Sequence, residues 1–165
     1  MNTPKKIKLT PTAARKKLES YCAYQERSHS EVREKLFGYG LFPNEVDQIV
    51  AYLITNNFLN EERFAEAYAS GKFSIKHWGK NKIKAGLKLK QVSEYSIRKA
   101  LASIDADDYF AVLKKEAEKK NKAIKLPSGL SKSQKEYRRR YKLMSYLLSR
   151  GFEASLIEEA IREIN

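Results

Sequence analysis

The residues of this chain best suited to binding a ligand are lysines that have no acidic neighbour in the sequence. They lie in residues 67–93. This run has no aspartate or glutamate, and its candidate binding residues are Lys72, Lys76, Trp78, Lys80, Lys82, Lys84, Lys88 and Lys90. Ammonium groups bind phosphate or carboxylate by charge, and an indole ring can stack on a base or a cation. The run therefore predicts contact with a polyanion, with a core anchor as the other interpretation of Trp78.

The spacing of three of these lysines predicts how they are presented. Lys80, Lys84 and Lys88 follow one another at i, i+4 and i+8, so they lie along one side of a helix. Ile83 and Leu87 mark the buried side of the same helix. A solvated helix surface also explains this pattern without a ligand, and both interpretations stay open.

A second basic site lies nearer the C-terminus and consists of Arg138, Arg139 and Arg140 with Lys142. Aromatic and aliphatic residues occur at helical spacing within and after this site, namely Tyr137, Tyr141, Met144 and Leu148. That spacing is typical of a core-facing stripe, so we expect the two tyrosines to point inward. A solvated surface again explains the arginines without a ligand.

The remaining reactive residues form no catalytic or metal-binding set. His77 has no acidic residue near it in the sequence, and a helix N-terminus explains the acidic cluster of residues 105–108. One cysteine and two histidines cannot supply a metal-ligand cluster, and Cys22 alone cannot form an intramolecular disulfide. We therefore expect no enzyme activity, no metal and no cofactor, with Cys22 as a buried, reduced thiol.

Net charge restricts the class of partner. The 165-residue chain carries a formal charge of +13, which favours nucleic acid, an acidic protein surface or anionic headgroups. No apolar run approaches the ~20 residues of a membrane span. Residues 1–9 are basic but lack the apolar centre of a secretory signal. We expect a cytoplasmic protein without a membrane partner.

Helical periodicity covers the chain, and no stretch sustains the alternation of a strand. Caps predict helix starts at Thr10, Ser28, Asn60 and Ser93, and further capping boxes are predicted at Ser133–Glu136 and Ser155–Glu158. The inward-facing residues are expected to include Ile54, Ala67 and Phe110. Residues 121–131 contain Pro-Ser-Gly and predict a loop.

One pattern recurs three times along the chain. Three apolar stripes begin at Val46, Ile97 and Ile157, and each is preceded at the same distance by a leucine, namely Leu36, Leu87 and Leu147. Gly40 and Gly151 occupy matching turns, whereas Gln91 stands in the middle copy, so that turn is expected to differ. We predict an all-α fold of three tandem three-helix repeats in an elongated molecule that can curve. The alternative is three unrelated helical hairpins.

The predicted domains are a flexible basic tail at residues 1–9 and repeats at 10–57, 58–105 and 106–165, the last with the loop at 121–131. Residues 28–54 also fit a helix–turn–helix unit. The second helix of that unit, residues 44–55, has no basic residue, which argues against base readout in the major groove.

Three motifs occur in a fixed order. Residues 27–36 read R-S-H-S-E-V-R-E-K-L and residues 59–65 read L-N-E-E-R-F-A, while Gly79, Ile83 and Leu87 form G-x-x-x-I-x-x-x-L. Through these motifs the chain resembles the RecX family of regulatory proteins, whose patterns are R-S-x-x-E-[LV]-R-x-K-L, L-[DN]-[DE]-x-R-F-A and G-x-x-x-I-x-x-x-L. It departs from the family at Gln91, where glycine is usual, and in the insert at residues 121–131.

The resemblance implies three tandem three-helix units and a non-enzymatic regulator. Such a regulator binds the RecA recombinase filament on DNA and inhibits or modulates its recombinase and ATPase activity. Single- or double-stranded DNA would be contacted by charge rather than by sequence, and we expect a monomer. A stand-alone nucleic-acid-binding protein is the alternative. The family signature residues, which also fit structural roles, are Arg27, Glu31, Arg63 and Phe64.

Overall fold

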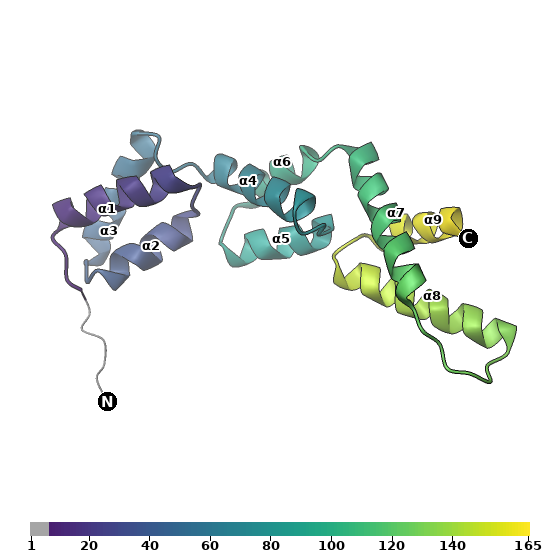
Figure 1. The fold of residues 1–165 in the computed structure, drawn as a ribbon. Helices are drawn as coiled ribbons and strands as arrows, with labels where there is room; N and C mark the ends of the chain where they lie inside the picture. The colour runs from purple at the N-terminus through teal and green to yellow at the C-terminus, as the bar shows by residue number, and fades with distance from the viewer. Residues whose placement is uncertain (1–6) are drawn as a thin grey trace, which may run out of the picture. The chain divides into compact units, whose positions relative to one another are not determined.

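The computed structural model describes residues 7–165, and this part of the chain is all-helical (Figure 1). The helices are α1 (Pro11–Tyr24), α2 (His29–Gly38), α3 (Pro43–Thr55), α4 (Glu61–Ser74), α5 (Lys80–Leu89), α6 (Glu94–Ala102), α7 (Ala106–Ala123), α8 (Lys132–Ser149) and α9 (Ala154–Ile164). Nine helices and no strand among these residues confirm the predicted all-α class.

The chain divides into two compact units, which are described separately. The first unit runs to Ala67 and includes Leu87–Lys99, and the second comprises Tyr68–Gly86 and Ala100–Asn165. The division into three repeats at residues 57/58 and 105/106 stays a prediction. Residues 1–6 of the predicted tail lie outside the described residues. Leu9, the last residue of that tail, is bound to the first unit: its N–H donates to the Tyr39 carbonyl oxygen at 3.1 Å.

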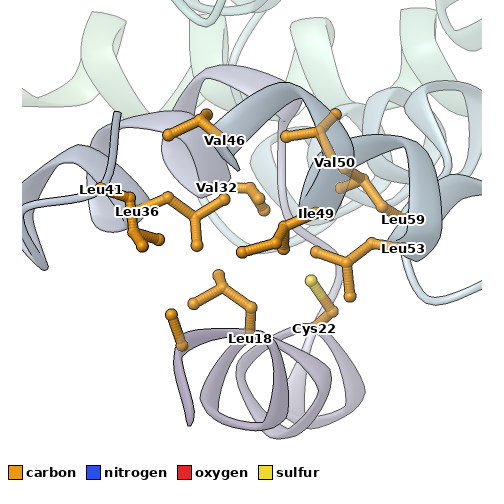
Figure 2. Close-up of a cluster of buried hydrophobic side chains, with 11 residues drawn as sticks. Leu18, Cys22, Val32, Leu36, Leu41, Val46, Ile49, Val50, Leu53 and Leu59 are labelled. Carbon is orange, nitrogen blue, oxygen red and sulfur yellow. The ribbon is translucent and has the colours of Figure 1, made fainter. Parts of the chain in front are cut away.

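The core of the first unit lies where α3 packs against α1 and α2. Leu18 and Cys22 point from α1 towards the apolar side chains of α2 and α3 (Figure 2). The buried cluster is Ala14, Leu18, Cys22, Val32, Leu36, Leu41, Val46, Ile49, Val50, Leu53 and Leu59. Each buried leucine or isoleucine contributes about 1.5–3 kcal/mol of transfer free energy. Cys22 is a buried, free cysteine, as the sequence predicts, and burial raises the pKa of its thiol to about 11.

Local caps begin several helices where the sequence predicts them. The Thr10 hydroxyl accepts from the Ala13 N–H at 3.2 Å, and the Asn60 side chain accepts from the Arg63 N–H at 2.9 Å. Ser28 and Glu31 form the predicted capping box, which satisfies two backbone donors at the start of α2.

The inward-facing side of two helices is narrower than predicted. Ile54 is 45% exposed at the end of α3, and Ala67 is exposed on α4. On α4 Phe64 is buried, as its spacing predicts, together with Ala65 and Ala69. The expectation was wrong for Ile54 and Ala67 because a helix–helix contact covers only part of the apolar arc.

The second unit has its core where α7 packs against α8 and α9. Asp105 caps α7 by accepting from the Asp108 N–H at 2.9 Å, which confirms that this acidic cluster begins a helix. Tyr109 is 2% exposed, whereas the predicted Phe110 is only partly buried. Helix α7 also continues to Ala123, so the predicted loop at 121–131 is shorter and covers 124–131.

Helix α8 faces the core with a different side from the predicted one. Tyr137, Tyr141 and Leu148 are 70%, 64% and 46% exposed, while Leu143 and Leu147 are buried. The predicted core stripe is therefore wrong, although the threefold pattern of leucines places Leu147 correctly. Two predicted capping boxes are also wrong: Ser131 and Gln134 form the box of α8, and α9 begins at Ala154 after the N-cap residue Glu153, which makes no side-chain cap.

The turn that recurs in the sequence pattern has one backbone conformation in all three copies. Gly40, Gln91 and Gly151 have φ of 80°, 59° and 94°, all left-handed. The expectation that the middle turn differs is thus wrong, because Gln91 adopts the same left-handed conformation as the two glycines. Glycine adopts this conformation at lower cost than other residues do. The residue after each turn is buried, namely Leu41, Val92 and Phe152.

Candidate polyanion-binding surface

The junction between α4 and α5 carries the tryptophan of the basic run. The His77 N–H donates to the Phe73 carbonyl oxygen at 3.0 Å, and the Trp78 N–H donates to that of Lys72 at 3.1 Å. His77 is left-handed, with φ of 54°, and its bond to the carbonyl four residues earlier closes α4 with an αL C-cap. The turn therefore fixes the backbone on which Trp78 is presented.

Trp78 is only partly buried and lies close to two lysines. The Nζ atoms of Lys72 and Lys82 lie 4.8 and 4.6 Å from its ring centroid. Such cation–π contacts favour ammonium groups held over the ring. In the structure, the ammonium groups of one lysine from α4 and one from α5 lie near the indole ring. Trp78 therefore has positive charge beside it from two helices.

The lysines of the basic run fall into two groups. Lys88 pairs with Glu94 at 3.4 Å and Lys90 pairs with Glu31 at 2.7 Å, so folding supplies these two with carboxylates. Within the described part of the chain, five others make no ion pair with a carboxylate, and they are Lys72, Lys76, Lys80, Lys82 and Lys84. Lys76 is exposed and the other four are partly exposed. These five residues all belong to the second unit.

Lys80 is also tied to the core by its backbone. Its N–H donates to the Tyr109 hydroxyl at 2.9 Å, and that hydroxyl donates to Glu153 Oε2 at 2.5 Å. Burial, followed by the hydrogen bond to the Glu153 carboxylate, raises the pKa of Tyr109. The phenol therefore stays protonated and holds the first residue of α5 in place.

The three arginines of α8 differ in their surroundings. Arg139 is partly buried and donates to the Asn121 carbonyl oxygen at 2.9 Å and to Asn121 Oδ1 at 3.2 Å. Arg140 is exposed and lies 3.9 Å from Glu158. Arg138 is exposed and forms no ion pair among residues 7–165. Arg139 thus ties α8 to α7, and only Arg138 and Arg140 are presented to solvent.

Folding also brings an acid to His77, contrary to the sequence interpretation. Glu116 is only 7% exposed; its Oε1 lies 2.8 Å from His77 Nδ1, and its Oε2 accepts from the Tyr146 hydroxyl at 3.1 Å. Burial alone would raise the pKa of Glu116, but the hydrogen bonds and charges of its neighbours outweigh burial and lower it. One signal was available, because Glu116 lies on the same side of α7 as Leu113 and Ala117.

Metal binding and membrane insertion find no support in the described part of the chain. Among the described residues no group of three or more histidine, cysteine or acidic side chains is arranged to hold a metal ion. Over the same residues, no helix combines the length and the apolar character that crossing a bilayer requires.

Comparison with known proteins decides the family. The model of the second three-helix domain of RecX matches residues 60–101, and that of the third three-helix domain matches residues 107–161. The chain belongs to the RecX family. The regulatory protein RecX of Clostridium perfringens strain 13 is 30% identical over 138 residues, which is 84% of this chain and 62% of that protein. RecX of Vibrio vulnificus is 27% identical over 139 residues, 84% of each chain.

Solved RecX structures have the same fold. The crystal structure of RecX from Lactobacillus salivarius matches with a TM-score of 0.79 at 23% identity, covering 93% of this chain and 95% of that one. A crystal structure of regulatory protein RecX matches with a TM-score of 0.80 at 22% identity, covering 92% and 71%. The chain spans about three-fifths of the length of the clostridial relatives with which it shares 30% identity.

The RecX signature residues make local contacts in the first unit. Arg27 donates to the Tyr21 carbonyl oxygen at 3.1 Å and stacks on the Tyr21 ring at 3.7 Å. Arg63 pairs with Glu26 at 2.9 Å, and Phe64 is 6% exposed. Glu31 completes the α2 capping box. These contacts give each signature residue a structural role, as the sequence interpretation allowed.

Proposed function

We propose that this RecX-family protein is a non-enzymatic regulator that binds the RecA recombinase filament on DNA. Bound there, it inhibits or modulates the recombinase and ATPase activity of RecA in DNA repair and recombination. Membership of a family of regulatory proteins supports this proposal. The observation that carries the binding part is the group of five lysines without carboxylate partners in the second unit, two of which, Lys72 and Lys82, lie over the Trp78 ring.

Unpaired ammonium groups suit a nucleoprotein filament for a physical reason. DNA phosphates and acidic protein side chains both attract them, and counterion release makes binding to phosphate favourable at low salt. If about five lysines contact the phosphates of a single strand, log K falls with log salt at a slope near −3.5. We expect the protein to act as a monomer in the cytoplasm.

A stand-alone nucleic-acid-binding protein is the second candidate. The formal charge of +13 favours it, because non-specific affinity for DNA needs only charge. In that case RecA would be affected only through competition for DNA.

RecA ATP hydrolysis on single-stranded DNA separates the two candidates. With DNA in excess over both proteins, a filament-binding regulator inhibits when it is substoichiometric to RecA. Inhibition only at concentrations that coat the DNA supports the stand-alone binder and refutes the regulator.

Replacing lysines on α5 tests the surface itself. We expect Lys80→Gln/Lys82→Gln/Lys84→Gln to weaken filament or DNA binding and to reduce the salt slope by about 2, since each phosphate contact contributes about 0.7. Exposed lysines of α7 provide a control with the same loss of charge, Lys115→Gln/Lys119→Gln/Lys122→Gln. Binding titrations over a salt series measure both. Equal effects of the two triples would mean that net charge, rather than the α5 surface, carries the affinity.

A further inference from the structure

The outward side of α8 is an uncovered aromatic surface. Tyr137, Tyr141 and Leu148 lie at i, i+4 and i+11 and are 70%, 64% and 46% exposed. Single exposed apolar residues are ordinary on proteins, but two tyrosines and a leucine aligned on one side of a helix are not. The stripe is therefore a candidate surface for a ligand or a partner.

The orientation of α8 is fixed, so this stripe cannot turn inward. Leu143 and Leu147 are at most 2% exposed on the opposite side, and Tyr146 donates to the buried Glu116. Successive helical residues are rotated by about 100°, so Tyr141 and Leu143 point about 160° apart. Burying Tyr141 would expose Leu143, which makes the outward tyrosines a stable feature of the second unit.

Charge on this side of α8 identifies the class of partner. Glu136 is the single acidic residue in the helix, against three lysines and three arginines. Arg138 is exposed beside Tyr137 and Tyr141, and the exposed Lys142 follows Tyr141 directly. Lys142 reaches only a carbonyl oxygen, that of Lys125 at 3.1 Å, so its charge is not neutralised. The stripe thus combines aromatic rings with uncompensated cations.

We propose that this side of α8 binds single-stranded DNA, with bases stacked on Tyr137 and Tyr141 and phosphates contacted by Arg138 and Lys142. Aromatic platforms bordered by cations bind single strands in this way, because every unpaired base offers a face to a ring. A duplex hides those faces within its own stack. Another copy of this basic chain is disfavoured as the occupant because like charges repel.

The spacing of the rings adds a geometric requirement. Tyr141 follows Tyr137 by four helical steps, a rise of about 6 Å along α8. Adjacent bases in B-form DNA rise by about 3.4 Å. Neighbouring bases on the two rings therefore need a strand that is extended beyond B-form, which a single strand permits.

This proposal rests on the DNA-binding part of the proposed function and deepens it, and its main test measures DNA binding in the absence of RecA. Fluorescence anisotropy with labelled dT20 compares wild type, Tyr137→Ala/Tyr141→Ala and Tyr137→Phe/Tyr141→Phe. Stacking two bases contributes enough that the alanine pair should lose at least about tenfold in affinity, whereas the phenylalanine pair should keep it. The salt slope should not change in either pair, because a ring releases no counterion.

Two further variants locate the effect. Arg138→Gln/Lys142→Gln should reduce the salt slope by about 1.4. The control Tyr24→Ala/Tyr95→Ala removes two exposed tyrosines of the first unit, 84% and 58% exposed, and should bind dT20 like wild type. Far-UV circular dichroism checks that each variant is folded.

Several results would overturn the inference. One is wild-type affinity of the Tyr137→Ala/Tyr141→Ala pair for dT20, and another is an equal loss of affinity for a duplex of the same length. A change of oligomeric state in that pair would assign the stripe to self-association. Loss of RecA inhibition with full affinity for dT20 would assign it to a protein interface, and the proposed regulator would then stand without this DNA site.

Discussion

Gly79 lies where the start of α5 meets the turn between α8 and α9, and Gly79→Ala should destabilise the second unit strongly. A Cβ at Gly79 would lie 2.2 Å from the Gly151 carbonyl carbon and 2.3 Å from the Phe152 nitrogen. Both are backbone atoms, so no side chain can move aside. The two segments would have to separate by about 1 Å to reach ordinary contact distance.

That separation would break two hydrogen bonds that join the segments. The Gly79 N–H donates to the Arg150 carbonyl oxygen at 2.8 Å, and the Asn81 N–H donates to that of Gly151 at 2.9 Å. Losing each bond costs about 1 kcal/mol, and more where the donor stays buried, as at Gly79. We expect a loss of about 3 kcal/mol, which lowers the Tm by about 6–12 °C in a chain of this size.

Urea and thermal unfolding followed by far-UV circular dichroism measure this loss, with Gly71→Ala as the matched control. Gly71 lies on α4, where a Cβ would meet open space, so alanine there should stabilise the helix by about 0.5–1 kcal/mol. We expect the free energy of unfolding to fall in Gly79→Ala and to rise in Gly71→Ala. If Gly79→Ala unfolds at the same urea concentration as Gly71→Ala, close backbone approach does not hold these segments together.

Two other predictions concern strain and pH. Gln91→Gly should raise the free energy of unfolding by up to about 1 kcal/mol, because glycine adopts the left-handed φ of 59° without strain. An unchanged urea midpoint would show that the backbone of Gln91 is not strained. Glu116 has a pKa below its ordinary value in the folded protein, so its contribution is present above about pH 4.3 and is lost as the pH falls through the folded pKa. Between pH 7 and 3, urea midpoints should therefore fall further for wild type than for Glu116→Gln, and parallel falls would contradict this assignment.

Short-range signals predicted most of the fold. Caps such as Thr10, Ser28 and Asn60 act within three residues, so the sequence displays both the donor and the acceptor. The recurring turn also survives the replacement of glycine, because Gln91 takes the same left-handed conformation as Gly151. Here the periodic leucines, which need burial, predicted the backbone better than the identity of the turn residue did.

Helix α8 shows where periodicity fails. Two apolar stripes compete in its sequence, one with Tyr137 and Tyr141 and the other with Leu143 and Leu147. Amphipathicity alone assumes that the larger aromatic stripe is buried, but tyrosine is only intermediate in its tendency to be buried. The threefold repeat indicated Leu147 as a core residue, and this indication could have been preferred over the tyrosine stripe. The tyrosines then become candidates for binding because the core does not use them.

Charge along the sequence was the least reliable guide to the candidate surface. The run of residues 67–93 has no acid of its own, yet Glu31 reaches Lys90 across 59 residues and Glu94 reaches Lys88. Counting neighbours in sequence cannot detect such pairs, since they depend on packing between helices. The same packing brings lysines together over Trp78 without a carboxylate, so positive charge persists where folding concentrates it rather than wherever the sequence lacks acids.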